Sequence, residues 1–332
     1  MTAKFDEGKP GAYAEVLEYL KKNDTGYSNS REIAESLNVS RQVIYDAVAY
    51  LRDCGYVIGA SRHEGYSLRE SPDKLVPVGI AAGLRCRQFA NRIYTYDEVG
   101  STNASALEMA KSGQPAGTLV VADSQFQGRG RMGRKWHSPR GKGLYFSLIL
   151  RPDLPIDRIS GLSLVAGLGI IRALKETADC QFQIKWPNDI LFRKKKLAGI
   201  LVEMSAELDR VQFMIVGIGI NVNQNRKDFP LGLQRKATSL KIACGKTVSR
   251  LLLLQEILTQ FESLYINFCR HGFEFLASEL IEHSAIIGKN ITLRIGSKKI
   301  TGKAVGFDDC GRLLVKNKRG LMSYPAGEVT FR

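Results

Sequence analysis

The stretch GRGRMGRKW, residues 128–136 and hereafter the glycine-arginine loop, has the residue types best suited to chemistry. Its glycines allow the backbone to approach a ligand closely, and its arginines offer paired N–H donors to an anion. The wider segment 124–152 carries seven basic side chains and no acidic one. These residues predict either a clamp for phosphate or carboxylate, or a flexible basic loop that binds nucleic acid.

Two nucleotide-binding motifs match the glycine-arginine loop only in part. Gly128, Gly130 and Gly133 have the spacing of a dinucleotide-binding loop, which must lead directly into a helix. Pro139 and Gly141 follow instead, so no helix can begin there. Gly128 and Gly133 also approach the spacing of a P-loop, but the Lys-Ser/Thr pair that reaches the outer phosphates is missing. Both motifs are therefore excluded.

Three further motifs occur in a fixed order with this loop: GSTNASAL at 100–107, KWPNDI at 185–190 and KLAGILVEM at 196–204. Together the four motifs closely resemble those of the bacterial biotin protein ligases. The resemblance covers nearly the whole chain and extends to the bifunctional subclass that also represses the biotin operon. It implies that biotin and ATP give biotinyl-5′-adenylate and pyrophosphate, and that a lysine of biotin carboxyl carrier protein then attacks the adenylate.

The resemblance also implies roles for individual residues. The expected biotin-binding residues are Ser101, Thr102, Asn103, Gln125, Arg129, Gly130, Arg131, Lys196 and Gly217. The residues expected to act on the ATP phosphates and the reacting carboxylate are Arg129, Arg131, Arg134, Lys185, Asn188 and Lys196. Joining a carboxylate to an α-phosphate brings two anions together, and a loop rich in Arg and Lys suits this chemistry because it screens their repulsion.

Some of these residues have simpler explanations, which stay open at this point. Ser101 could serve only as the N-cap of a helix, and Trp136 could be a core residue instead of stacking near the loop or the adenine. Asp189 is the expected ligand of Mg²⁺, since a hard cation prefers oxygen ligands. It could instead serve only as an ion-pair partner of the loop arginines. Biotin and ATP are expected as substrates, with no permanently bound cofactor.

Two further segments are expected near the site. The segment 229–240, FPLGLQRKATSL, resembles the family's second mobile loop, in which Phe229 or Leu233 would form an apolar lid over the adenine. The basic run 193–195 is most simply a solvated turn, although its charge could also attract an acidic carrier protein.

The elements that must position these residues predict an α+β fold. Strand-like runs and helix-like runs alternate without a regular βαβ repeat, which indicates an antiparallel or mixed central sheet. The predicted strands are 93–96, 119–122, 144–150, 182–186, 190–192, 197–204 and 211–218, and the predicted helices are 159–178 and 249–269. By resemblance, this core is similar to that of class II synthetases.

The predicted domains are a winged helix-turn-helix (1–72), a linker (73–85), the ligase domain (86–284) and a C-terminal SH3-like domain (285–332). Short strands separated by glycines in the last segment favour a small β-barrel. In the first segment Asn29 and Glu32 resemble a capping box, and Ser40 is the expected N-cap of the next helix. A different small helical domain is the alternative for this segment.

The DNA-facing residues of the helix-turn-helix are expected at the start of its third helix, namely Ser40, Arg41, Gln42 and Tyr45. Residues 1–70 contain nine Lys/Arg and eleven Asp/Glu, a balance of −2. This balance opposes strong nonspecific binding by a monomer, although the whole chain has a net charge of +15. A repressor that binds its operator as a homodimer, formed when biotinyl-5′-adenylate is bound, fits this distribution.

Composition limits the remaining choices. The six cysteines form no C-x-x-C pair, which favours reduced thiols over zinc binding or disulfides. No apolar run is long enough to span a membrane and no secretory signal is recognised, so cytoplasmic residence is expected, with no membrane partner. Three alternatives stay open: a monofunctional ligase whose N-terminal domain does not bind DNA, a non-catalytic biotin-sensing repressor, and a lipoate ligase.

Overall fold

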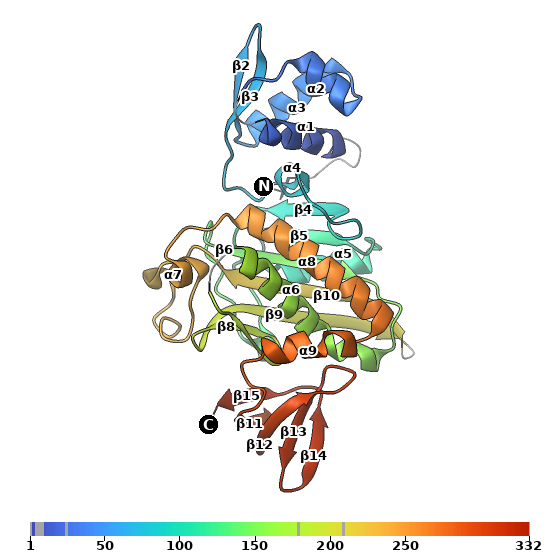
Figure 1. Ribbon diagram of the computed structural model, residues 1–332, viewed down its shortest axis with the longest axis vertical. Helices are drawn as coiled ribbons and strands as arrows, with labels where there is room; N and C mark the ends of the chain where they lie inside the picture. Colours follow the sequence, from blue (N-terminus) through green and yellow to red (C-terminus); the bar gives the residue numbers. More distant parts are fainter. Residues whose placement is uncertain (1, 4–9, 24–25, 178–179, 208–209, 332) are drawn as a thin grey trace.

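The computed structural model describes residues 2–3, 10–23, 26–177, 180–207 and 210–331. They form an N-terminal unit of helices and a hairpin, a central eight-stranded sheet covered by helices, and a C-terminal five-stranded sheet. Figure 1 shows the N-terminal and C-terminal units at opposite ends of the long axis, with the central sheet between them. The predicted α+β class with a mixed central sheet is confirmed.

The N-terminal unit has the predicted winged helix-turn-helix arrangement. The capping box at the second helix is present, because the Asn29 side chain accepts from backbone N–H groups and Glu32 Oε2 accepts from Asn29 N, 3.3 Å away. Ser40 Oγ accepts from the backbone N–H of Val43 at the start of the third helix. The elements are α1 (Pro10–Lys22), α2 (Ser30–Leu37), α3 (Arg41–Asp53), β2 (Val57–Ser61) and β3 (Gly65–Glu70).

The central sheet has the strand order β1-β4-β5-β6-β10-β9-β8-β7. β4 and β5 pair in parallel and the other neighbours pair antiparallel, so the sheet is mixed. The strands are β1 (Thr2–Ala3), β4 (Arg92–Tyr96), β5 (Thr118–Ala122), β6 (Gly143–Leu150), β7 (Gln183–Lys185), β8 (Asp189–Phe192), β9 (Lys195–Glu207) and β10 (Arg210–Asn221).

Helices cover both faces of the sheet around β5 and β6. Leu119 and Val121 pack in the main core with α6 and α8, whereas Val120 points to the other face and packs with Ala106 of α5. Every residue of β6 is buried for this reason. The helices are α5 (Thr102–Lys111), α6 (Leu162–Thr177), α7 (Leu240–Cys244), α8 (Arg250–His271) and α9 (Glu274–Glu282), with short 3-10 turns at Arg131–Gly133, Ile156–Gly161 and Arg226–Asp228.

The C-terminal unit is one antiparallel sheet with the strand order β14-β13-β12-β11-β15. Leu293, Val315 and Val329 are buried between it and the rest of the main core. The strands are β11 (Asn290–Ile295), β12 (Lys298–Phe307), β13 (Leu313–Asn317), β14 (Gly320–Tyr324) and β15 (Glu328–Phe331).

The structure differs from the sequence-based expectation at a few elements. The helix predicted at 159–178 begins as a 3-10 turn, and Ala178 lies outside the described residues. Helix α9 is not predicted, because it is short and its N-cap, Phe273, makes no side-chain cap. The predicted linker contains a helix, α4 (Pro77–Ala81), which begins at a proline.

Two expectations about composition can also be compared with the structure. All six cysteines are free thiols, as predicted. Among the described residues, which exclude most of the first nine, no helix combines the length and apolar character that crossing a membrane requires.

Candidate active site

A cavity of about 580 Å³ lies between the glycine-arginine loop, strands β9 and β10, and the C-terminal sheet. Its volume is in the usual range for small-molecule sites. The structure places all the predicted ligand, phosphate and magnesium residues around it: Ser101, Thr102, Asn103, Gln125, Arg129, Gly130, Arg131, Arg134, Lys185, Asn188, Asp189, Lys196 and Gly217. Residues far apart in the sequence thus line one cavity, and their roles toward a ligand stay predictions.

One end of the cavity is a network of neutral polar side chains at the start of α5. Gln125 Oε1 accepts from Thr102 N and Oγ1, at 2.9 and 3.2 Å, and its Nε2 donates to Ser138 Oγ at 2.9 Å. Asn103 Nδ2 donates to a Glu203 carboxylate oxygen at 2.7 Å. Ser101 occupies the N-cap position, but its side chain makes no capping hydrogen bond, so capping alone does not explain it.

Two glycines of β10 make room for the cavity wall. A Cβ at Gly217 would lie 1.7 Å from Asn103 Oδ1, and a Cβ at Gly219 would lie 2.5 Å from Trp136 Nε1. Gly217 therefore allows the close approach of a neighbouring side chain that forms the wall. Gly219 has the same function for the indole, although sequence reasoning did not select it. The repeat of glycine at alternate positions of a strand was the available signal, because such positions share one face.

The glycine-arginine loop is a compact turn in this structure. Its two ends are joined by hydrogen bonds from Trp136 N to Gly128 O and from Gly130 N to Arg134 O, at 2.8 and 2.7 Å. It leads into strand β6 without an α-helix, in agreement with the exclusion of a dinucleotide-binding loop. Arg131 points inward and its Nη1 donates to Asn188 Oδ1 at 3.3 Å.

Trp136, the last residue of the glycine-arginine loop, lines the cavity and is not among the buried core residues. Lys196 Nζ lies 5.3 Å from the centre of its ring, close enough for a cation–π contact. The indole Nε1 is buried and has no hydrogen-bond partner among the described residues. A buried donor of this kind is available to a ligand.

The other end of the cavity is strongly cationic. Seven basic residues line the cavity, against two acidic residues, Asp189 and Glu328. The basic residues are Arg129, Arg131, Arg134, Lys135, Lys185, Lys196 and Lys236. Burial lowers the pKa of Arg131, and the nearby carboxylates of Asp189 and Glu328 oppose that shift. Since a guanidinium stays charged in proteins, this end suits a polyanion.

Asp189 does not pair with a loop arginine, as the sequence alternative suggested, but with Lys196, whose Nζ lies 2.6 Å from Asp189 Oδ1. One carboxylate already paired with a lysine offers few ligands for a resident metal ion. Mg²⁺ binds commonly through one or two carboxylates together with substrate phosphates. The donor set therefore fits an ion that arrives with a nucleotide, and the role of Asp189 as its ligand stays a prediction.

The C-terminal sheet contributes a wall that sequence reasoning missed. Gly327, Glu328, Val329 and Thr330 line the cavity, and the Glu328 carboxylate pairs with Arg134 of the glycine-arginine loop. Nothing in the local sequence marks these residues as part of the site. Their position depends on how the last sheet packs on the central domain.

The second expected lid also lies at the cavity. Phe229 is buried and Leu233 is partly exposed, and both line the cavity. The segment is attached to the strand that carries Lys196, because Lys196 N donates to Lys236 O and Thr238 N donates to Lys196 O. The segment and Lys196 therefore share one wall.

The expected DNA-facing residues lie together at the start of α3. Ser40, Arg41, Gln42 and Tyr45 are all exposed. The turn before them is tight because Asn38 adopts a left-handed conformation with φ of 51°. Helix α3 thus presents its first turn to solvent, as a recognition helix must. DNA contact by these residues stays a prediction.

Comparison with known proteins agrees with this geometry. The model of the biotin/lipoate A/B protein ligase family matches residues 97–221, a helix-turn-helix model matches 14–67, and the model of the biotin protein ligase C-terminal domain matches 286–332. The bifunctional ligase/repressor BirA of Bacillus subtilis is 39% identical over 315 residues, which cover 95% of this chain and 97% of that protein.

Two further relatives resemble part of the chain. The biotin–[acetyl-CoA-carboxylase] ligase of Paracoccus denitrificans is 34% identical over 70% of this chain and 97% of its own length. The structure of the Aquifex aeolicus biotin protein ligase with biotin and ATP superposes with a TM-score of 0.63 at 35% identity, covering 73% of this chain and 98% of that chain.

The central domain has a mixed sheet with a cationic ligand cavity, and it is joined to a helix-turn-helix domain. This combination defines a class of enzymes that carry a domain of the DNA-binding type. The chain belongs to the biotin protein ligase family, and its match to the bifunctional ligase/repressor members runs over nearly its full length.

Proposed function

We propose that this chain joins biotin to a lysine of biotin carboxyl carrier protein through biotinyl-5′-adenylate, and that the adenylate-bound form represses genes of biotin synthesis and transport. The observation that carries the catalytic half is that one cavity is lined both by a hydrogen-bonded network of uncharged polar side chains and by seven basic side chains, here called its neutral and cationic ends. The neutral end suits the uncharged ring system of biotin. The cationic end suits the triphosphate.

In the first step, a carboxylate oxygen of biotin attacks the α-phosphorus of ATP, the bond to the β-phosphate breaks, and pyrophosphate leaves. Both reactants are anions, so the step needs positive charge where they meet. Arg129, Arg131 and Lys196 are the residues we assign to this meeting point, with Arg134 and Lys185 toward the outer phosphates. Asn188 positions Arg131 through its side-chain oxygen.

In the second step, the lysine amine of the carrier attacks the acyl carbon, the bond to the phosphate oxygen breaks, and AMP leaves. The mixed anhydride must be protected from water until the carrier arrives. We assign this protection to the glycine-arginine loop and to the segment 229–240, both of which contribute residues to the cavity lining. Glu328 supports the loop from the C-terminal sheet through its pair with Arg134.

Magnesium would reach the site with ATP, and Asp189 is the residue that would contact it. An ion bound to the phosphates supplies charge neutralisation in addition to that from the protein. The Lys196–Asp189 pair holds the amine of Lys196 at the cavity wall.

The repressor half requires a DNA-binding form that depends on the ligand. We assign Ser40, Arg41, Gln42 and Tyr45 to operator contact, and we propose that the adenylate-bound chain forms a homodimer that places two such helices on a palindromic site. The full-length match to a bifunctional relative supports this half of the proposal, since the N-terminal unit is included in the match.

The test is an assay of purified chain with ATP, a carrier domain and either biotin or lipoate. Pyrophosphate release and labelling of the carrier should require biotin. Release with lipoate in place of biotin would contradict the assignment. A footprint on the promoter of biotin genes, with and without biotin and ATP, tests repression. A footprint that does not change when the ligands are added would contradict the repressor half and leave only the ligase half of the proposal.

A further inference from the structure

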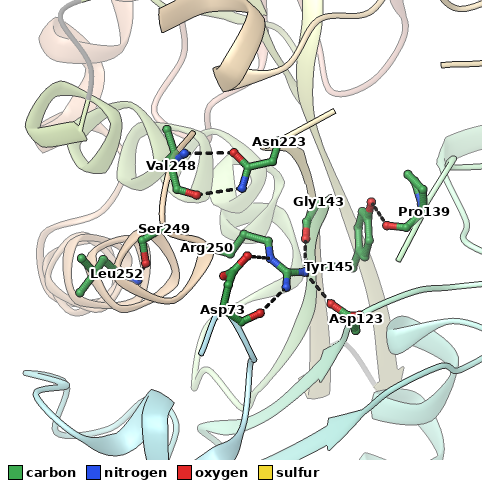
Figure 2. Close-up of polar contacts among 10 residues, drawn as sticks. All are labelled: Asp73, Asp123, Pro139, Gly143, Tyr145, Asn223, Val248, Ser249, Arg250 and Leu252. Carbon is green, nitrogen blue, oxygen red and sulfur yellow. Dashed lines mark hydrogen bonds and ion pairs between the residues drawn. The ribbon is translucent and has the colours of Figure 1, made fainter. Parts of the chain in front are cut away.

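Arg250, the first residue of α8, is an almost completely buried cation, with a side chain 3% exposed. Its guanidinium binds two carboxylates from different parts of the chain, as Figure 2 shows. Nη1 donates to Asp123 Oδ1 at 2.6 Å and to Gly143 O at 3.3 Å. On the other side, Nε donates to Asp73 Oδ2 at 3.2 Å and Nη2 donates to Asp73 O at 2.8 Å.

The first pair of contacts lies at the base of the catalytic loop. Asp123 follows directly on the last residue of β5, and Gly143 is the first residue of β6. The chain between them includes Gln125 and the whole glycine-arginine loop. One nitrogen of Arg250 therefore binds both strand ends between which the segment carrying the glycine-arginine loop runs.

The second pair of contacts lies on the segment that joins the N-terminal unit to the core. Asp73 is between β3, which ends at Glu70, and α4, which begins at Pro77. The segment is bound to α8 a second time, because Gln255 Nε2 donates to the carbonyl oxygens of Gly79, Ile80 and Ala82 at 2.8 to 3.2 Å.

Helix α4 itself belongs to two cores. Val78 and Ala82 are buried in the core of the N-terminal unit, whereas Leu75 and Ile80 are buried in the main core of the central domain. The segment is therefore not a loose tether. Asp73 lies on the same short segment as α4, and α4 packs against α1 of the helix-turn-helix.

We propose that Arg250 couples the glycine-arginine loop to the placement of the helix-turn-helix. A buried guanidinium must keep its charge paired, and its planar fork fixes where its partners lie. When the base of the loop shifts, Asp123 and Gly143 displace the fork, and Asp73 follows. Arg250 is thus a positioning residue, and the inference rests on the proposed function for the ligand that orders the loop.

The variants that test this coupling must leave the fold intact. Arg250→Ala is a poor choice, because it would leave the Asp123 carboxylate without its cationic partner next to the space vacated by the arginine side chain. Asp73→Ala is better, because the Asp73 side chain is 51% exposed and Arg250 keeps its pair with Asp123. Arg250→Lys also keeps the charge but lacks the fork. The matched control is Glu70→Ala, an exposed acidic residue of the same stretch with no ion pair among the described residues.

The measurement is hydrogen exchange of the full chain with and without biotin, ATP and magnesium. The amides of Ile80 and Ala82 report on α4, since they donate to Val76 O and Val78 O. In the unaltered chain and in Glu70→Ala we expect the ligands to change exchange both in the loop and at these amides. In both variants we expect the loop response to stay. We expect the α4 response to be reduced in Asp73→Ala, which keeps the contact from Arg250 Nη2 to the Asp73 backbone oxygen, and to be lost in Arg250→Lys.

Two outcomes would overturn the coupling: an α4 response that is undiminished in both variants, or a loop response in the unaltered chain with no change at α4. Pyrophosphate release in the same samples keeps this separate from the proposed function. An unaltered chain that releases no pyrophosphate refutes the ligase assignment. Release without any change at Ile80 and Ala82 refutes the coupling alone.

Discussion

The position of the Asn103 side chain determines the shape of the cavity at its neutral end. Asn103 is fixed from two sides, because its Nδ2 donates to Glu203 and its Oδ1 lies 2.6 Å from Ser147 Oγ. It cannot move away from β10 without breaking buried hydrogen bonds, each of which costs roughly 1–3 kcal/mol when a partner is left unsatisfied.

We therefore expect Gly217→Ala to weaken biotin binding strongly. The new Cβ would lie 1.7 Å from Asn103 Oδ1, so the Asn103 side chain must leave its position. A loss of one buried hydrogen bond corresponds to roughly a 5- to 150-fold rise in the Kd for biotin. Calorimetric titration with biotin measures it. Gly306→Ala is the control, since its Cβ would meet nothing within 4 Å, and equal losses in the two variants would contradict the argument.

The cationic end makes a different prediction, for Arg131→Gly. Arg131 is the loop arginine that reaches Asn188, and losing a charge-assisted contact costs roughly 1.5–3 kcal/mol. The adenylate should still form but should leave the cavity about 10- to 150-fold faster. Labelling of a bystander protein mixed with biotin and ATP detects the escaped intermediate. The control is Arg140→Gly, since Arg140 is exposed and lies outside the cavity lining, and this variant should retain the adenylate. Equal leakage of the adenylate from both variants would contradict the role assigned to Arg131.

Helix α3 is the element that we assign to DNA contact. One face of the helix is buried in the core, while residues of its first turn are exposed. The helix follows a tight turn in which Asn38 has a left-handed conformation. The near-neutral charge of this unit means that base contacts, more than general attraction to phosphate, must supply affinity.

We expect Gln42→Ala to reduce operator affinity without changing carrier biotinylation. Gln42 is exposed on the first turn of α3, where a side chain can reach base edges, and one good base contact is worth about 1–3 kcal/mol, roughly 5- to 150-fold. Gel-shift titration against labelled operator measures the change. Asp53→Ala, at the far end of the same helix, should bind as the unaltered chain does; the recognition assignment fails if only this control loses affinity.

At the scale of the whole molecule, ion pairs contribute to both junctions between the three units. Arg250 connects the segment before α4 to the central sheet, and Glu328 connects the C-terminal sheet to the glycine-arginine loop. The cavity is therefore complete only when the C-terminal sheet is packed in place. The lining of the cavity thus comes from both the central domain and the C-terminal segment that includes β15.

Biotin and ATP added together should therefore stabilise the chain more than the sum of their separate effects. A ligand present at about 1,000 times its Kd contributes about 4 kcal/mol through mass action, and we expect the adenylate formed in place to bind more tightly than either substrate. Thermal unfolding with each substrate alone and with both measures this. Simple additivity of the two shifts would argue that no shared intermediate is retained. Arg131→Gly should show a smaller combined shift.

The sequence alone determined the fold class, the strands and main helices, the helix-turn-helix and the family resemblance. Its local signals are physical: alternate apolar positions bury one face of a strand, and the Asn29 capping box starts a helix wherever it folds. The glycine-arginine loop could be selected because its residue types suit an anion, whereas the other residues around the cavity were implied by the family resemblance. Of the two β10 glycines at the cavity wall, only Gly217 was among the residues expected from the sequence.

Only the tertiary structure decided which partners these residues have. Glu328 lies on the last strand, and Asp73 and Arg250 are 177 residues apart, so their contacts depend on packing between units. Local sequence does not identify the partner in such a contact, because any opposite charge that packing brings within reach can pair with a buried charge.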